Sequence, residues 1–128
     1  MFKVAYRDLA DVEPFLHLPV TAEETYSIGE GLVLTGGTLT KVGATAKPSY
    51  IAQADKADAD GNLLVIPVLP TTHFETTSTA TVASELVGSK VTLHTDGLTV
   101  TATTTSGVFT IDKTDGAATN SIVVGHFE

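Results

Sequence analysis

Residues 31–41 read GLVLTGGTLTK, and this stretch decides the fold class. The segments on either side of its centre, residues 31–35 and 38–42, have the Val, Leu and Thr content of β-strands. Between them, Gly36-Gly37 supplies two residues that tolerate positive φ, as a tight hairpin turn requires. The stretch therefore predicts a β-hairpin with a two-residue turn.

The C-terminal forty residues predict an antiparallel meander of about four strands. Residues 91–95 and 98–102 alternate in polarity around Asp96-Gly97, one of the strongest short-range hairpin signals. A further strand starts at Gly107, and Asp115-Gly116 turns the chain toward a last strand that includes Ile122. Threonine, the commonest residue of the chain, is frequent here, which suits strands.

The segments outside these hairpins complete an all-β pattern. Single strands are predicted at residues 2–6, 48–53, 62–69 and 72–77, whereas residues 8–20 lose periodicity at two prolines and indicate a connector. Residues 79–88 have rough helical spacing, with a loop containing a strand as the competing interpretation.

We therefore predict an all-β fold, a small antiparallel barrel or sandwich built from two meanders, with an extended N-terminal arm and at most one short helix. The arm and connector occupy residues 1–25, and residues 26–128 form a single β domain. Within that domain, residues 26–78 and 89–128 are candidate sub-meanders.

Composition excludes several classes of protein. The 128 residues include 15 Asp and Glu against 7 Lys and Arg, a net charge of −8, with 42% hydrophobic residues and no cysteine. A disordered chain would be less apolar, a disulfide scaffold or thiolate zinc module needs cysteines, and a nucleic-acid binder is usually basic. No signal peptide is visible, and the longest apolar stretch, residues 63–69, is too short for a bilayer. We expect a protein made in the cytoplasm, with no nucleic-acid or membrane partner.

Motifs for metal binding are incomplete. Residues 55–62 imitate a calcium loop, but aligning Gly61 at the sixth position puts Lys56 first and Pro67 twelfth, where carboxylates are needed. His73 with Glu75, and His94 with Asp96, are pairs on one strand face, whereas a zinc or iron site needs three or four converging ligands. No metal ligand is assigned, and His126, in step with Ile122 and Val124, is interpreted as a core or interface histidine.

Catalytic motifs are absent from the sequence as well. There is no cysteine and no Gly-x-Ser-x-Gly nucleophile elbow, and Gly29-Glu30-Gly31 lacks the third glycine of a dinucleotide loop. We predict no catalytic residue, no cofactor and no small-molecule substrate, that is, a protein without enzymatic activity.

Acidic residues gather near the N-terminus. Six of the fifteen lie between Asp8 and Glu30, and no Lys or Arg occurs between Arg7 and Lys41. Because this run is interleaved with Phe15, Leu16 and Leu18, it suits docking on a basic, partly apolar groove of a partner. The competing interpretation is a solvated loop whose apolar residues pack on their own domain.

As a whole, the chain resembles the capsid-decoration proteins of tailed bacteriophages. The likeness lies in the order of an N-terminal arm, the 31–41 hairpin, the segments PSYIA (48–52), LVIPV (64–68) and HFET (73–76), and a terminal meander rich in Thr and Gly. The resemblance implies a non-enzymatic virion protein, often a homotrimer, that binds the outside of the capsid, contacts the major capsid protein and bridges coat subunits.

On that interpretation the arm is the natural contact with the coat, because an extended segment can add a strand to a sheet edge. The candidate partner-binding residues are Phe2, Val4, Tyr6, Phe15, Leu16 and Leu18. Two alternatives remain open: a carbohydrate- or surface-binding β-sandwich such as an adhesin or fibre module, and a tail or head–tail joining protein.

Overall fold

The strands form two antiparallel five-stranded sheets in a computed structural model that describes residues 1–9 and 12–128. Sheet I has the order β1-β7-β10-β9-β8, and sheet II has the order β2-β6-β5-β3-β4. The bounds are β1 Lys3–Arg7, β2 Leu16–Pro19, β3 Gly31–Thr35, β4 Thr38–Lys41, β5 Tyr50–Ala52, β6 Asn62–Pro67, β7 Thr72–Thr77, β8 Lys90–Val91, β9 Phe109–Thr114 and β10 Ile122–Phe127. The all-β prediction is confirmed.

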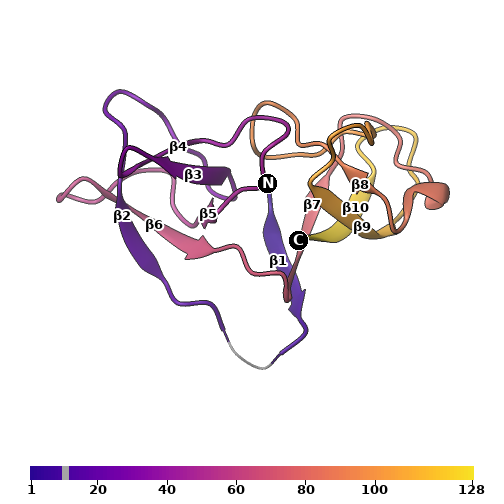
Figure 1. Cartoon of the computed structure of the whole chain (residues 1–128), viewed down its shortest axis with the longest axis horizontal. Coiled ribbons are helices and arrows are strands. Elements are labelled where there is room, and N and C mark those ends of the chain that lie inside the picture. Colours follow the sequence, from indigo (N-terminus) through magenta and orange to yellow (C-terminus); the bar gives the residue numbers. More distant parts are fainter. Residues whose placement is uncertain (10–11) are drawn as a thin grey trace.

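The sheets lie beside each other in Figure 1, sheet II on the left and sheet I on the right. Neither closes into a barrel, so that alternative is wrong. Sheet II comes nearest to closure, because beyond β2 an isolated parallel bridge joins Val20 to Leu39 of β4. In sheet I the edge strands β1 and β8 lie at opposite ends of the strand order.

The predicted hairpin at residues 31–41 is confirmed. Strands β3 and β4 pair from Leu32 with Lys41 to Thr35 with Thr38. Gly36 and Gly37 both have positive φ, 60° and 86°, which a side chain would make unfavourable.

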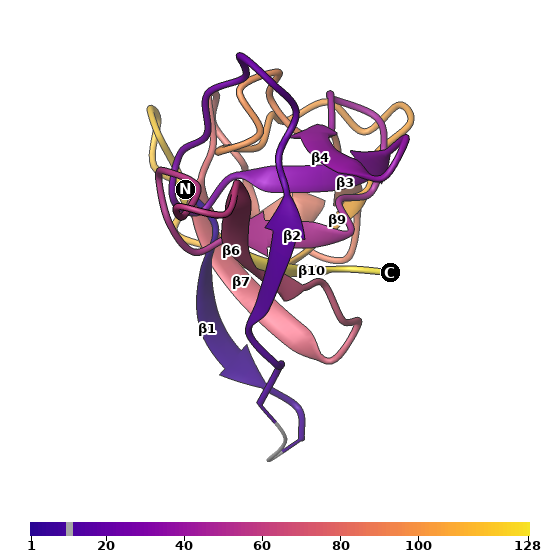
Figure 2. The same cartoon turned by 90° about the vertical axis from the view of Figure 1, so that its left-hand side faces the viewer.

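The first 25 residues contribute an edge strand to each sheet: β1 corresponds to the strand predicted at residues 2–6, whereas β2 lies within the predicted connector. Strand β1 pairs with β7, and β2 pairs with β6 through Leu16 opposite Val65 and Pro19 opposite Asn62. Proline is tolerated there because an edge strand leaves one side of its backbone unpaired. Figure 2 shows β1 running down toward the connector and β2 running up from it. The segment is therefore part of the fold rather than a free arm.

The boundary between the sheets also differs from the predicted sub-meanders. Strand β7 lies within residues 26–78, yet it belongs to sheet I with β9 and β10, so the chain changes sheet between β6 and β7. Residues 91–102 keep hairpin hydrogen bonds, His94 N–H to Thr99 and Thr101 N–H to Thr92, but only Lys90–Val91 forms a strand. The only helical element in the described residues is a 3₁₀ turn at Ser84–Leu86.

A central core joins the two sheets into one unit. It combines Ile51 and Ile66 of sheet II with Phe74, Phe109 and Phe127 of sheet I. A second apolar cluster occupies the other face of sheet II, and its buried members are Tyr26, Leu32, Leu39, Ala52, Leu63 and Val65. Sheet II is therefore apolar on both faces, whereas sheet I has an outer face that carries polar side chains.

Candidate docking surface and a histidine cluster

The connector between β1 and β2 presents the most exposed large hydrophobic side chains among the described residues. Leu9 is 58% exposed, Val12 66% and Phe15 65%. We call these three residues the docking tip. In Figure 1, β1 and β2 both reach toward the bottom of the molecule, where the described parts of the connector lie. Exposed apolar groups gathered on one segment are typical of an interaction site.

An ion pair in which the acid is buried anchors the base of the tip. Glu13 is 4% exposed, and its carboxylate accepts hydrogen bonds from Nε of Arg7 at 2.8 Å and from the hydroxyl of Thr72. The Nη2 atom of Arg7 is also 2.8 Å from the same carboxylate. Beside them, the backbone N–H of Asp8 donates to the carbonyl of Thr71 at 2.9 Å. The connector is thus tied to the start of β7, which holds the tip apart from the core.

The charge of Glu13 is set by these partners. Burial by itself would raise the pKa of the carboxyl group, but the hydrogen bonds from Thr72 and Arg7 and the Arg7 charge outweigh it and lower the pKa. Glu13 is therefore an ionised anchor at neutral pH.

The six predicted partner-binding residues divide into three groups. Phe2 is only 2% exposed and lies in the central core, so the structure does not offer it to a partner. Val4, Leu16 and Leu18 are half-buried and pack against the two apolar clusters. Only Tyr6, 49% exposed, and Phe15 present large apolar surfaces. Sequence alternation marked Phe2 as strand-like but could not show which face of the strand is covered.

Leu9 and Val12 were not among the predicted contacts. They lie in a segment without periodicity, where no pattern assigns a side chain to the core or to solvent. The signal that could have identified them is the break in alternation itself, because apolar residues outside a regular strand have no sheet face on which to be buried.

The acidic run is less exposed than its sequence indicates. Glu30 is 1% exposed, and its carboxylate lies 2.6 Å from Nζ of Lys41. Together with Glu13 and Arg7, this makes two ion pairs in which the acid is buried and the base is partly exposed. The two basic residues that flank the run in sequence thus neutralise two of its acids in the fold. Asp11, another member of the run, lies outside the described residues.

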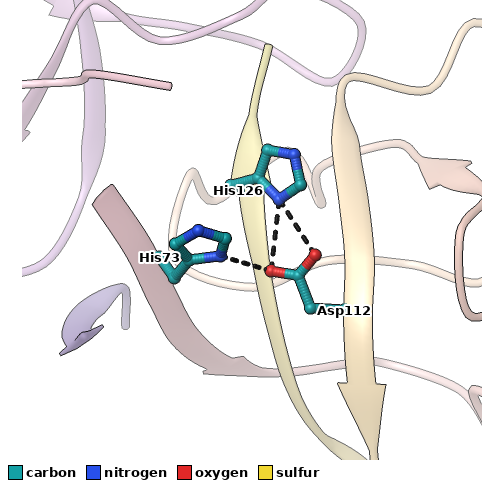
Figure 3. A group of neighbouring side chains, drawn as sticks. All are labelled: His73, Asp112 and His126. Atoms are coloured by element: carbon teal, nitrogen blue, oxygen red, sulfur yellow. Dashed lines mark hydrogen bonds and ion pairs between the residues drawn. The ribbon is translucent and has the colours of Figure 1, made fainter. Parts of the chain in front are cut away.

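A second polar feature lies on the outer face of sheet I, where His73, Asp112 and His126 converge from β7, β9 and β10 (Figure 3). Nδ1 of His73 is 2.5 Å from Oδ2 of Asp112, and Nδ1 of His126 is 3.0 and 3.1 Å from the two carboxylate oxygens. Side-chain exposures are 9% for His73, 18% for His126 and 22% for Asp112. We call these residues the histidine cluster.

Further groups surround the histidine cluster. Oδ1 of Asp8 lies 2.9 Å from Nε2 of His73, outside the geometry of a regular hydrogen bond, and Oε1 of Glu128 lies 3.1 Å from Nε2 of His126. Tyr6 stacks on the His73 ring, with centroids 4.3 Å apart and planes 11° from parallel. Burial lowers the pKa of His73, but the hydrogen bond to Asp112 and the nearby carboxylates of Asp112 and Asp8 outweigh it, so the net shift of the pKa is upward.

The two pairs that the sequence suggested as metal ligands, His73 with Glu75 and His94 with Asp96, do not come together in the structure. Glu75 pairs with Lys3, and Asp96 caps the turn through the N–H of Leu98, while His94 is exposed. His73 instead meets residues 39 and 53 positions further along the chain, which no local spacing reveals.

Comparisons with protein-family models, with curated proteins and with solved structures found no match to this chain. In the described part of the chain, no helix has the length and hydropathy needed to span a bilayer.

Proposed function

We propose that this chain is a non-enzymatic structural protein of a phage virion, which binds the outside of the capsid and stabilises the shell by bridging coat subunits. The observation that carries the proposal is the docking tip: three exposed apolar side chains of the connector, which is anchored by the Arg7–Glu13–Thr72 contacts. A tip that is held in place before binding loses less conformational entropy when a partner covers it.

The size of the tip favours several copies acting together. A stable protein interface buries about 800 Å² on each partner, more than three side chains supply. Identical tips on a homotrimer would engage a symmetric shell at several points, and linked contacts raise the overall affinity without any new kind of contact. A trimer is therefore part of the proposal, and light scattering of the purified chain measures it.

The test is co-sedimentation with expanded shells assembled from the major capsid protein encoded in the same genome. The wild-type chain should pellet with the shells, and the triple variant Leu9→Ser, Val12→Ser, Phe15→Ser should remain in the supernatant. The proposal is rejected if wild type does not pellet. If wild type and the variant pellet equally, the tip is not the contact.

A matched control carries the same kind of change away from the tip. Val87 and Ile122 are each 47% exposed and lie outside the connector. The double variant Val87→Ser, Ile122→Ser should pellet like wild type. If it also stays in the supernatant, loss of binding is a general effect of removing surface apolar groups.

The alternatives are outcomes of the same assay. Binding to purified tails in place of shells would indicate a tail or head–tail joining protein. Binding to a glycan array with neither particle would indicate a carbohydrate-binding module. For such a module Tyr26 offers no stacking platform, because it is buried with its hydroxyl bonded to the Leu39 carbonyl, and Tyr6, 49% exposed, would be the tyrosine to test.

A further inference from the structure

The histidine cluster brings three metal-ligating side chains from separate strands to one point. The ligand atoms of His73, Asp112 and His126 all lie within 4.8 Å of one another. In a tetrahedral zinc site, bonds of about 2.0–2.2 Å place neighbouring ligand atoms about 3.3 Å apart. The observed Nδ1-to-carboxylate distances of 2.5 to 3.1 Å therefore need to lengthen by less than about 1 Å to admit an ion. The ligand atoms that lie farthest apart, within 4.8 Å, need to approach each other by up to about 1.5 Å.

The far side of each imidazole faces a carboxylate. Asp8 lies beside Nε2 of His73, and Glu128 lies beside Nε2 of His126. Without a metal, Nδ1 of each histidine donates its proton to Asp112. When an ion displaces these Nδ1 protons, a carboxylate beside Nε2 favours the remaining ring proton on Nε2, which leaves Nδ1 with a lone pair. Histidines that bind metals commonly have such a carboxylate behind them, because it fixes the tautomer and orients the ring.

This arrangement creates an electrostatic requirement at the centre. If both Nε2 atoms carry protons, two Nδ1 lone pairs and the Asp112 carboxylate point at one another, and they repel unless positive charge lies between them. Two further protons, or one divalent ion, would supply the same charge of +2. The site is partly open, since His126 and Asp112 are about one-fifth exposed, so an ion has a route from solvent.

We propose that His73, His126 and Asp112 bind one divalent transition-metal ion of the Zn²⁺ class, with Asp8 and Glu128 positioning the two histidines. Two imidazoles and a carboxylate are a ligand set that zinc and ferrous iron accept, with a fourth position left open. The ion would tie together β7, β10 and β9, which are neighbours in sheet I. This inference does not depend on capsid binding.

Zinc titration of the full chain tests the proposal. Chelator-treated protein at pH 7.5 should bind one Zn²⁺ per chain by calorimetry. Its unfolding temperature should rise by about 10 °C when free Zn²⁺ is 100-fold above Kd. Co²⁺ used as a probe should give visible absorption bands characteristic of low coordination.

Variants separate ligands from positioning residues. His126→Gln should reduce Zn²⁺ affinity at least 100-fold, and Glu128→Gln, which leaves all three ligands in place, should reduce it about 10- to 100-fold. His94→Gln removes an exposed histidine elsewhere and should bind like wild type. Circular dichroism of each variant checks that it folds.

Three results would overturn the proposal. The first is the absence of Zn²⁺ and Co²⁺ binding by the folded wild type. The second is equal loss of affinity in the His94 variant, which would indicate nonspecific histidine binding. The third is a stability that changes with pH between 6 and 8 but not with metal, which would show that protons alone supply the positive charge.

Discussion

Replacing Phe2 by alanine tests whether the N-terminal strand belongs to the core. The Phe2 ring is 2% exposed, and its centroid lies 6.4 Å from that of Phe74 and 5.5 Å from those of Phe109 and Phe127. Truncating a buried phenylalanine ring to alanine costs about 3–5 kcal/mol, because the transfer free energy of the ring is lost and a cavity is left behind. Since small domains are stable by about 5–15 kcal/mol, Phe2→Ala should remove a large part of the free energy of unfolding.

Urea unfolding followed by circular dichroism measures this loss. With a slope of about 2 kcal/mol per molar urea, a loss of about 4 kcal/mol moves the midpoint down by about 2 M. The unfolding temperature should fall by roughly 12–20 °C, at about 4 °C per kcal/mol for a chain of this size.

Phe15→Ala is the matched control, because it removes the same ring from a side chain that is 65% exposed. Its free energy of unfolding should stay within about 0.5 kcal/mol of wild type. Equal stability of the two variants would refute the reasoning, since it would mean that β1 does not pack against the other phenylalanines. In the shell-binding assay the order should be reversed, because Phe15 belongs to the docking tip: Phe15→Ala should weaken binding more than Phe2→Ala does, provided that Phe2→Ala remains folded.

Three further predictions concern buried charge and close packing. Lys41→Met should destabilise the chain by about 1–3 kcal/mol, because it leaves the buried Glu30 carboxylate with the Ser27 N–H but without its charged partner, whereas Lys41→Met with Glu30→Gln should cost clearly less; equal losses in urea unfolding would contradict this. The pKa of Glu13 is lower in the folded chain than its usual 4.5. The ionised Glu13 side chain therefore stabilises the fold fully above pH 4.5, and this contribution is lost as the pH falls through the folded pKa. The free energy of unfolding, measured from pH 6 to 3, should depend less on pH in Glu13→Gln than in wild type. Gly125→Ala should cost at least about 1–3 kcal/mol, because a Cβ there would lie 2.2 Å from the Thr110 carbonyl oxygen; a thermal melt like that of wild type would disprove the close approach.

Short-range sequence patterns predicted those elements that are stabilised by short-range interactions. The Gly36-Gly37 turn and the strand at residues 72–77 appear where the sequence indicates, because turn conformation and strand propensity depend on neighbouring residues. Residues 98–102 were predicted as a strand on similar local evidence, yet within them only Val100 pairs, in isolated bridges with Leu93 and Ser78. One cause is visible at the turn, where the Gly97 carbonyl accepts a hydrogen bond from Gly31 N–H and so joins this hairpin to sheet II.

The candidate site was predicted only in part. Phe15 was named from its place in an acidic, apolar segment, and the structure leaves it exposed. Phe2 was named from its place in the extended N-terminal arm and is buried, since exposure depends on what packs against a strand. The histidine cluster was not predicted, because its three residues meet only when β7, β10 and β9 pair in register.

The sequence by itself determined the all-β class, the hairpin turns and the surplus of acidic residues, because these follow from composition and from short-range spacing. The tertiary structure alone decided that residues 1–25 complete both sheets, that Arg7 and Lys41 neutralise buried acids, and that His73, Asp112 and His126 converge. The physical reason is the range of the interactions. Turn geometry and strand propensity act over a few residues, whereas burial, ion pairing and ligand convergence depend on which distant strands become neighbours.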